Sequence, residues 1–257
     1  MQLRFQLTAV ATLCLSLAAP GLAALIPPGT QLHATQTIIR NNGSEPDTLD
    51  PAVAESVGAN NITRDLFEGL TANDSDGKLV PGVAESWKQT NPTTWVFKLR
   101  PNAKWSNGDP VTAEDFLFGI RRFVDPKTAS TYAATFGSFL LNGKDIVAGK
   151  KPSSAIGVKV IDKLTLEVQT AFPVTFLPNL MVNNNLGPVH KASLEKNGKD
   201  WTKPGKLVSN GAYVLKDWQV NNRVVIEKNP QYWDAANVQL TKVTYLPIED
   251  GYADVKL

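Results

Sequence analysis

The sequence predicts a mixed α/β protein with mixed sheets. The first observation is a pair of hairpin patterns, at residues 158–168 and 213–228, in which β-favouring runs flank short polar turns. The second observation is a pair of segments, at 60–70 and 112–124, whose apolar residues recur at helical spacing. Because strands and helices alternate along the chain and hairpins are prominent, one purely parallel sheet is disfavoured.

Residues 1–23 have the pattern of a secretory signal peptide and are not expected to belong to the fold. Arg4 supplies a positive charge, residues 5–19 are mostly apolar, and residues 21–23 place small side chains before a cleavage point. An uncleaved membrane anchor is the alternative. Cleavage removes Cys14, the only cysteine, so the mature chain would have no disulfide and no thiol chemistry.

The first elements after that segment are expected to be a loose arm, a strand and a helix. Two prolines and a glycine interrupt the arm at 24–36, and residues 37–41 form a β-favouring run. The helix is expected over 60–70. Its apolar face consists of Ile62, Leu66, Phe67 and Leu70.

A strand at 94–99 and a capped helix follow. Thr112 is a suitable N-cap, and acidic residues occupy the first turn after it. The apolar face of this helix consists of Phe116, Ile120, Phe123 and Val124. Arg121 and Arg122 fall on the opposite side, so we expect both to be solvated.

The remaining elements are expected to be short. They are helices at 172–180 and 191–196 and a final strand at 242–246. We expect the six tryptophans to pack in the core. Tryptophans that stack on sugars would look the same in sequence, which leaves carbohydrate binding open.

Composition and motifs argue against nucleic-acid binding and against catalysis. The formal net charge is +2 without long blocks of like charge, and 42% hydrophobic residues suit a soluble globular protein. His33 and His190 lie far apart, and no phosphate-binding, dinucleotide or nucleophile motif occurs. The adjacent acids Glu114 and Asp115 suit helix capping better than acid–base chemistry. We therefore predict no enzyme activity and no cofactor.

A series of short motifs runs in a fixed order along nearly the whole chain after residue 23. The motifs are N-N-G-S-E at 41–45, L-D-P at 49–51, R-D-L-F-E-G-L at 64–70, P-G-V-A-E-S-W at 81–87, W-V-F-K-L-R at 95–100, W-S-N-G-D-P-V-T-A-E-D-F at 105–116, V-D-P-K-T-A-S-T-Y-A at 124–133, L-G-P-V at 186–189, W-T-K-P-G at 201–205, N-G-A-Y at 210–213, N-P-Q-Y-W at 229–233 and V-T-Y-L-P-I at 243–248. Together they resemble the extracytoplasmic solute-binding proteins of the peptide/nickel transporter class, especially the oligopeptide- and murein-peptide-binding branch.

The resemblance implies a fold of the periplasmic-binding-protein type, with two lobes and a hinge. Residues 24–67 and 192–257 would form an incomplete first lobe, and residues 68–191 an inserted small α/β domain. It also implies a periplasmic protein that binds extended short peptides through their main chain and delivers them to the membrane permease of an ABC importer. Full-length members are expected to be monomers.

The resemblance also assigns candidate ligand-binding residues. Glu55, Ser56, Val57 and Gly58 match a segment that pairs with the peptide backbone, and Tyr132 matches an aromatic residue that lines the cleft. Alternatively, Glu55 is a loop carboxylate in solvent, and Tyr132 packs in the core of the small domain.

The sequence stops where the family continues with a second lobe, which holds the acidic group for the peptide's amino terminus. We therefore expect weak or undetectable peptide binding by this chain alone, and self-association through open sheet edges. Two other functions stay open. One is binding of a non-peptide ligand such as nickel or haem, and the other is glycan hydrolysis by a secreted enzyme.

Overall fold

Three sheets carry the fold of the computed structural model, which describes residues 29–249. The first sheet has the strand order β1-β10-β9-β8, the second has the order β4-β5-β7-β6, and the third is the pair β2-β3. Strand β1 pairs in parallel with β10, whereas the other strand pairs are antiparallel. The predicted mixed α/β class with mixed sheets is therefore confirmed. The predicted signal peptide lies outside the described residues.

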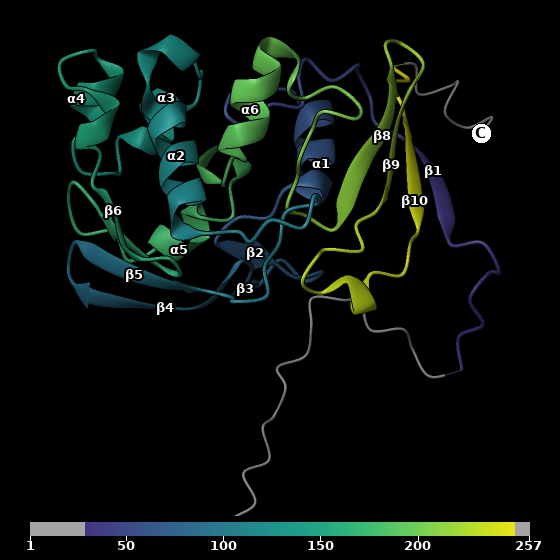
Figure 1. Cartoon of the computed structure of the whole chain (residues 1–257), viewed down its shortest axis with the longest axis horizontal. Helices are drawn as coiled ribbons and strands as arrows, with labels where there is room; N and C mark the ends of the chain where they lie inside the picture. Colours follow the sequence, from purple (N-terminus) through teal and green to yellow (C-terminus); the bar gives the residue numbers. More distant parts are fainter. Residues whose placement is uncertain (1–28, 250–257) are drawn as a thin grey trace, which may run out of the picture.

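The first sheet joins distant parts of the chain. Its strands are β1 (Thr37–Asn41), β8 (Tyr213–Gln219), β9 (Arg223–Lys228) and β10 (Lys242–Leu246). β1 and β10 have the predicted bounds, and β8 and β9 together span the predicted hairpin at 213–228. In Figure 1 these strands stand together at one end of the molecule, with α1 beside β8. The side chain of Ile39 is 65% exposed, so β1 leaves an apolar sheet edge in the described chain.

The second sheet supports a layer of helices. Its strands are β4 (Ala84–Asn91), β5 (Thr94–Leu99), β6 (Val158–Asp162) and β7 (Thr165–Gln169). Figure 1 shows α2 (Ala113–Val124), α3 (Ala133–Gly137) and α4 (Gly143–Val147) over one face of this sheet. Alternate residues of β5 and β7 are buried, with Phe97 and Leu166 fully enclosed, which is the burial that β alternation predicts.

Helix α1 (Val57–Leu66) begins three residues earlier and ends four residues earlier than predicted. Ile62 and Leu66 are buried on the helix, as expected. Phe67 and Leu70 are buried too, but they belong to the extended segment that follows the helix. Gly69 lets this segment approach another part of the chain closely, because a Cβ at this position would lie 2.3 Å from the carbonyl oxygen of Met181.

Helix α2 begins where the sequence predicts. The Asp115 carboxylate accepts hydrogen bonds from the N–H and the hydroxyl of Thr112, at 2.8 and 2.9 Å, which closes the first turn. The four residues of the predicted apolar face are all fully buried. Gly119 lets this face approach another segment closely, since a Cβ would lie 2.1 Å from the Gly187 carbonyl oxygen.

The connecting elements are short. They are β2 (Thr71–Asn73), β3 (Leu79–Pro81), α5 (Leu177–Leu180), α6 (Lys191–Asn197) and the 3-10 turns η1 (Pro126–Thr128), η2 (Ser153–Ala155), η3 (Asn184–Leu186), η4 (Gly198–Asp200) and η5 (Ala235–Asn237). Trp95, Trp105 and Trp201 are buried, which confirms core packing for these three tryptophans. Between residues 29 and 249, no helix has the length and apolar content that a bilayer crossing requires.

Candidate functional site

Asp47 fixes the loop that leads into α1. Its carboxylate accepts hydrogen bonds from the backbone N–H groups of Glu55 and Ser56, at 3.2 and 3.3 Å, and from the Ser56 hydroxyl at 2.5 Å. Partial burial acts to raise the pKa of Asp47. The hydrogen bonds outweigh that effect, so the pKa lies below its usual range. Asp47 is thus ionised at neutral pH and holds the candidate segment in one conformation.

The start of α1 presents backbone donors without acceptors. Ser56 caps the helix by accepting a hydrogen bond from the Ala59 N–H at 3.0 Å. Within residues 29–249, the N–H groups of Val57 and Gly58 have no acceptor. The Val57 side chain is 77% exposed, whereas Gly58 is buried. A peptide carbonyl is the kind of acceptor that these donors can bind.

Helix formation changes the expected geometry of the segment. The resemblance implied strand-like pairing along 55–58, but only its first half is extended, with Ser56 at φ −71° and ψ 152°. Val57 and Gly58 already belong to the first helical turn. The segment therefore offers donors at a helix N-terminus rather than a full strand edge.

Gly58 allows the helix to approach the loop before it. A Cβ at Gly58 would lie 2.7 Å from the Ser44 carbonyl oxygen, too close for any other residue without a shift of the backbone. The Asn42 side chain donates a hydrogen bond to the Gly58 carbonyl at 2.9 Å. Asn42 and Ser44 were not among the predicted site residues, although both lie within the motif at 41–45.

Glu55 and the segment around Tyr132 meet in the structure. The Thr131 hydroxyl donates a hydrogen bond to the Glu55 carboxylate. Tyr132 itself is half-buried and packs against Phe136, with ring centroids 5.8 Å apart. Glu55 is therefore exposed but hydrogen-bonded, and Tyr132 combines core contact with partial exposure. Thr131 was missed because its partner lies far away in the sequence.

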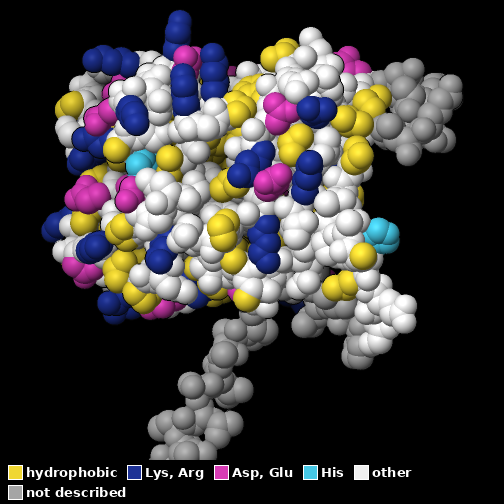
Figure 2. Space-filling model, turned by 45° about the vertical axis from the view of Figure 1, so that its right-hand side comes forward, with side chains coloured by type: hydrophobic (Ala, Val, Ile, Leu, Met, Phe, Trp, Pro, Cys, Tyr) yellow, Lys and Arg dark blue, Asp and Glu magenta, His cyan; other side chains and the backbone are white. Residues whose placement is uncertain are grey.

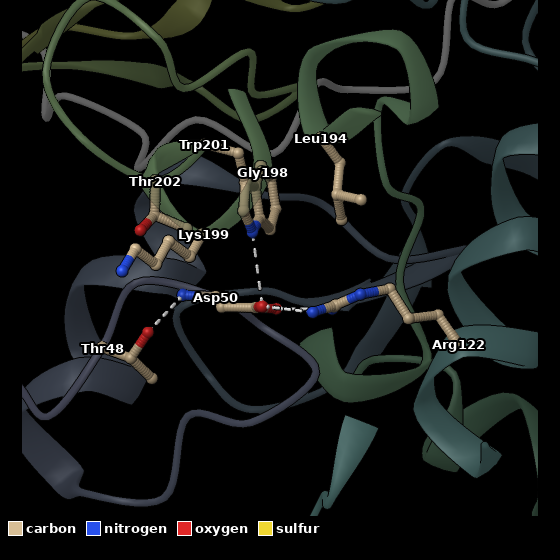
Figure 3. Close-up of a pocket in the computed structure, with 8 residues that line it drawn as sticks. All are labelled: Thr48, Asp50, Arg122, Leu194, Gly198, Lys199, Trp201 and Thr202. Atoms are coloured by element: carbon tan, nitrogen blue, oxygen red, sulfur yellow. Dashed lines mark hydrogen bonds and ion pairs between the residues drawn. The ribbon is translucent and has the colours of Figure 1, made fainter. Parts of the chain in front are cut away.

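Asp50 connects three separate parts of the chain. The two oxygens of its carboxylate accept hydrogen bonds from Arg122, at 2.8 and 2.5 Å, and the Trp201 indole donates at 3.4 Å (Figure 3). The Arg122 and Asp50 side chains are 20% and 10% exposed, so the expectation that Arg122 is solvated is wrong. Burial of the pair strengthens its electrostatic attraction. The ion pair also lines a hollow of about 320 Å³.

A buried carboxylate lies where α1 gives way to β2. Glu68 accepts hydrogen bonds from the Tyr232 hydroxyl at 2.5 Å and from the Trp233 indole at 2.7 Å. Arg100 covers the Trp233 ring, with 3.8 Å between its guanidinium carbon and the ring centroid. Burial raises the pKa of Glu68 to about 7 against the lowering effect of these donors. The network fixes residues 229–233 against the end of the first helix.

The rest of the described surface shows mixed charge. On the face drawn in Figure 2, Lys and Arg side chains are interspersed with Asp and Glu side chains. Among residues 29–249, no group of three or more His, Cys, Asp or Glu side chains is arranged to hold a metal ion. The His190 Nδ1 atom accepts a hydrogen bond from the Ser193 N–H at 3.1 Å, so its Nε2–H donates to the Asp109 carboxylate at 3.0 Å, and its position is accounted for by helix capping.

The fold is that of an extracellular solute-binding protein. Residues 78–257 match the model of the bacterial extracellular solute-binding proteins, family 5 Middle. The chain belongs to this family.

Relatives of known function extend the match over most of the chain. The periplasmic oligopeptide-binding protein OppA of Salmonella typhimurium is 49% identical over 234 residues, which cover 91% of this chain and 43% of OppA. The periplasmic murein peptide-binding protein MppA of Escherichia coli is 45% identical over 91% of this chain and 44% of MppA. The chain therefore spans less than half the length of these curated relatives.

Solved structures give the same result for the fold. OppA of Burkholderia pseudomallei superposes with a TM-score of 0.86 at 47% identity, over 88% of this chain and 44% of that one. OppA of Haemophilus influenzae, solved in complex with the peptide RPPGFSPFR, superposes with a TM-score of 0.85 at 42% identity, over the same shares of the two chains. The fold is thus of the periplasmic-binding-protein type.

Proposed function

We propose that this chain supplies the part of a periplasmic peptide-binding protein that contacts the main chain of an extended short peptide. The observation that carries the proposal is the N–H group of Val57, which has no acceptor among the described residues and lies at an exposed helix start that Asp47 holds in place. The N–H group of the buried Gly58 also has no acceptor among the described residues. Backbone donors recognise a feature that every peptide has, so affinity should depend little on side chains. Oligopeptide- and murein-peptide-binding relatives support the same conclusion.

The proposal includes a location, a partner and a division of the chain. The protein would reach the periplasm after removal of residues 1–23 and would deliver peptide to the membrane permease of an ABC importer. Residues 24–67 and 192–257 would form the first lobe, and 68–191 the inserted small domain. The separation of the first sheet from the second sheet supports this division.

A non-peptide ligand is the second candidate. One relative, 41% identical over 91% of this chain, is named a probable deoxycholate-binding periplasmic protein. The family therefore includes a member named for a ligand without a peptide backbone. Nickel or haem would need ligating side chains, and the described residues hold no cluster of them. A glycan hydrolase would turn over peptidoglycan fragments, which a pure binding protein would leave intact.

Titration with a panel of tripeptides tests the proposal. We expect trialanine, trilysine and triglutamate to bind with dissociation constants within about tenfold of one another, because about 1.4 kcal/mol separates each factor of ten and the shared backbone supplies the contacts. Because we expect this chain alone to bind peptides weakly, NMR titration would measure the dissociation constants, and micromolar or tighter binding by calorimetry would contradict that expectation. Saturable binding of nickel, haem or deoxycholate without any peptide binding would contradict the proposal, as would turnover of peptidoglycan fragments.

A further inference from the structure

Arg121 is a cation without a partner in the described structure. Its two neighbours in the sequence are in different environments, because Arg122 forms an ion pair with Asp50 and Ile120 is fully buried. Its Nε atom is enclosed by protein atoms and has no hydrogen-bond acceptor among residues 29–249. Its two Nη atoms make no hydrogen bond and are not enclosed, so they form the open end of the guanidinium.

Arg121 lines a hollow, which we call the Arg121 hollow. It is a depression of about 590 Å³ between the last turn of α2, η1, η2 and the loop before α1. Phe118 and Val53 supply apolar lining, and Arg121 and Lys127 supply positive charge. A site with apolar walls and a few polar groups is the usual form of a small-molecule site.

The negative groups nearby are already engaged. The Asp125 carboxylate accepts hydrogen bonds from the Lys127 N–H at 3.0 Å and from the Ser153 hydroxyl at 3.3 Å, and it makes no ion pair with Arg121. The carbonyl groups of Arg121 and Arg122 accept from the Asp125 N–H at the end of α2. That helix end favours a cation electrostatically but gives the guanidinium no acceptor.

Positive charge therefore exceeds negative charge around the Arg121 hollow. Lys127 has no ion-pair partner in the described chain, and the Lys191 ammonium lies 5.7 Å from the centre of the Phe118 ring while pairing with Glu195 at 3.6 Å. Arg122 and Asp50 cancel each other. Two cations and one carboxylate remain, namely Arg121, Lys127 and Asp125.

We propose that the Arg121 hollow binds a small organic carboxylate. The carboxylate accepts hydrogen bonds from the Nη atoms of Arg121, and the apolar part of the ligand contacts Phe118 and Val53. Guanidinium groups bind carboxylates through two parallel hydrogen bonds, and partial burial of Arg121 strengthens that interaction. The site uses no unpaired N–H group of α1, so it does not depend on peptide binding.

NMR of the uniformly ¹⁵N-labelled chain tests this directly. The enclosed Nε–H of Arg121 should exchange slowly with water and give a resolved signal. We expect 3-phenylpropionate to shift that signal saturably at concentrations below about 10 mM, whereas 3-phenylpropionamide, which has the same shape without the charge, should bind at least about tenfold more weakly. Equal binding of the acid and the amide would overturn the proposal. Absence of a saturable shift would overturn it too.

Two variants provide the controls. Arg121→Gln should weaken binding of 3-phenylpropionate at least about tenfold, and Arg64→Gln, the same change at an exposed position of α1, should leave it unchanged. Arg121→Gln should not lower the melting temperature, because the guanidinium has no partner to lose. A large fall in melting temperature would show a structural role and contradict the proposal. Inorganic phosphate that binds as tightly as 3-phenylpropionate would contradict the role given to Phe118 and Val53.

Discussion

The Arg122 guanidinium donates two hydrogen bonds to the Asp50 carboxylate, with N–O distances of 2.8 and 2.5 Å, and so joins α2 to the turn that precedes α1. Trp201 donates to the same carboxylate from a third part of the chain. This connection fixes the position of α2, which packs on the second sheet, relative to the segment that carries the candidate site. Its removal should therefore affect both stability and the site.

Arg122→Met should lower the free energy of unfolding by about 3 kcal/mol, because it leaves the Asp50 carboxylate buried without its countercharge. Urea denaturation would measure the loss. The matched control is Lys78→Met, which breaks an ion pair whose side chains are 74% and 68% exposed, and it should cost less than about 1 kcal/mol. Equal effects of the two substitutions would contradict the role of the buried pair.

Glu68 should make the protein more stable in mild acid. Burial raises its folded-state pKa from 4.5 to about 7, so the folded state binds more protons than the unfolded state between these values. The contribution is fully present below pH 4.5 and is lost as the pH rises through about 7. Asp234 adds to the rise in pKa, and Arg100 opposes it.

The measurement is the free energy of unfolding of the wild type minus that of Glu68→Gln, as a function of pH. The difference should fall by up to about 3 kcal/mol between pH 4.5 and about 7, since each pKa unit corresponds to about 1.4 kcal/mol. A difference that stays constant, or that grows as the pH rises, would show that the Glu68 carboxylate is not destabilised by burial.

Asp47→Ala should loosen the start of α1. It removes the acceptor of two backbone N–H groups and one hydroxyl at an exposed site, which should cost about 1 kcal/mol. Hydrogen exchange should become faster at the first amides of the helix. Asp74→Ala is the control, because Asp74 accepts two similar N–H bonds in the distant turn between β2 and β3. Faster exchange at α1 in both variants would contradict a specific role for Asp47.

The exposed edge of β1 should promote self-association. Ile38 and Ile39 are 42% and 65% exposed on a strand with one described partner, and such an edge can pair with a second chain. Sedimentation velocity should show oligomers that decrease in Ile39→Lys. Val220→Lys, which changes a 69% exposed residue in a hairpin turn, should leave them unchanged. A concentration-independent monomer in the wild type would refute this prediction.

Local patterns were enough to predict much of the fold. Strands β1, β5 and β10 match the expected ranges because their alternation or β-favouring composition is bounded by turns. Helix α2 matches because Thr112 and the four apolar residues of its buried face give independent signals. Strand β4 was missed because most of its side chains are exposed, which leaves a polar pattern without clear alternation.

Tertiary contacts account for most of the errors. Phe67 and Leu70 continue a helical pattern but are buried by close approach of another segment at Gly69. The sequence did contain a signal for the true start of α1, because serine is a favoured N-cap residue and Ser56 directly precedes the helix. Its side chain accepts a hydrogen bond from the Ala59 N–H. The partner of Arg122 lies 72 residues away, and no local pattern predicts a contact of that kind.

The candidate site was predicted only in part. The resemblance indicated residues 55–58 and Tyr132, whereas the structure adds Asp47, Asn42 and Thr131 as the residues that hold this segment. These three act through hydrogen bonds to distant backbone or side-chain atoms, which sequence spacing does not reveal.

The most direct test of the account is a ¹⁵N NMR titration of this chain with trialanine. Because the Val57 N–H has no acceptor and lies at an exposed helix start, its signal should move downfield and saturably, together with signals of Gly58 and the Thr131–Tyr132 segment. Asp47→Ala should reduce these shifts. Saturable shifts confined to other parts of the chain, with the Val57 signal unmoved, would contradict peptide binding at the start of α1.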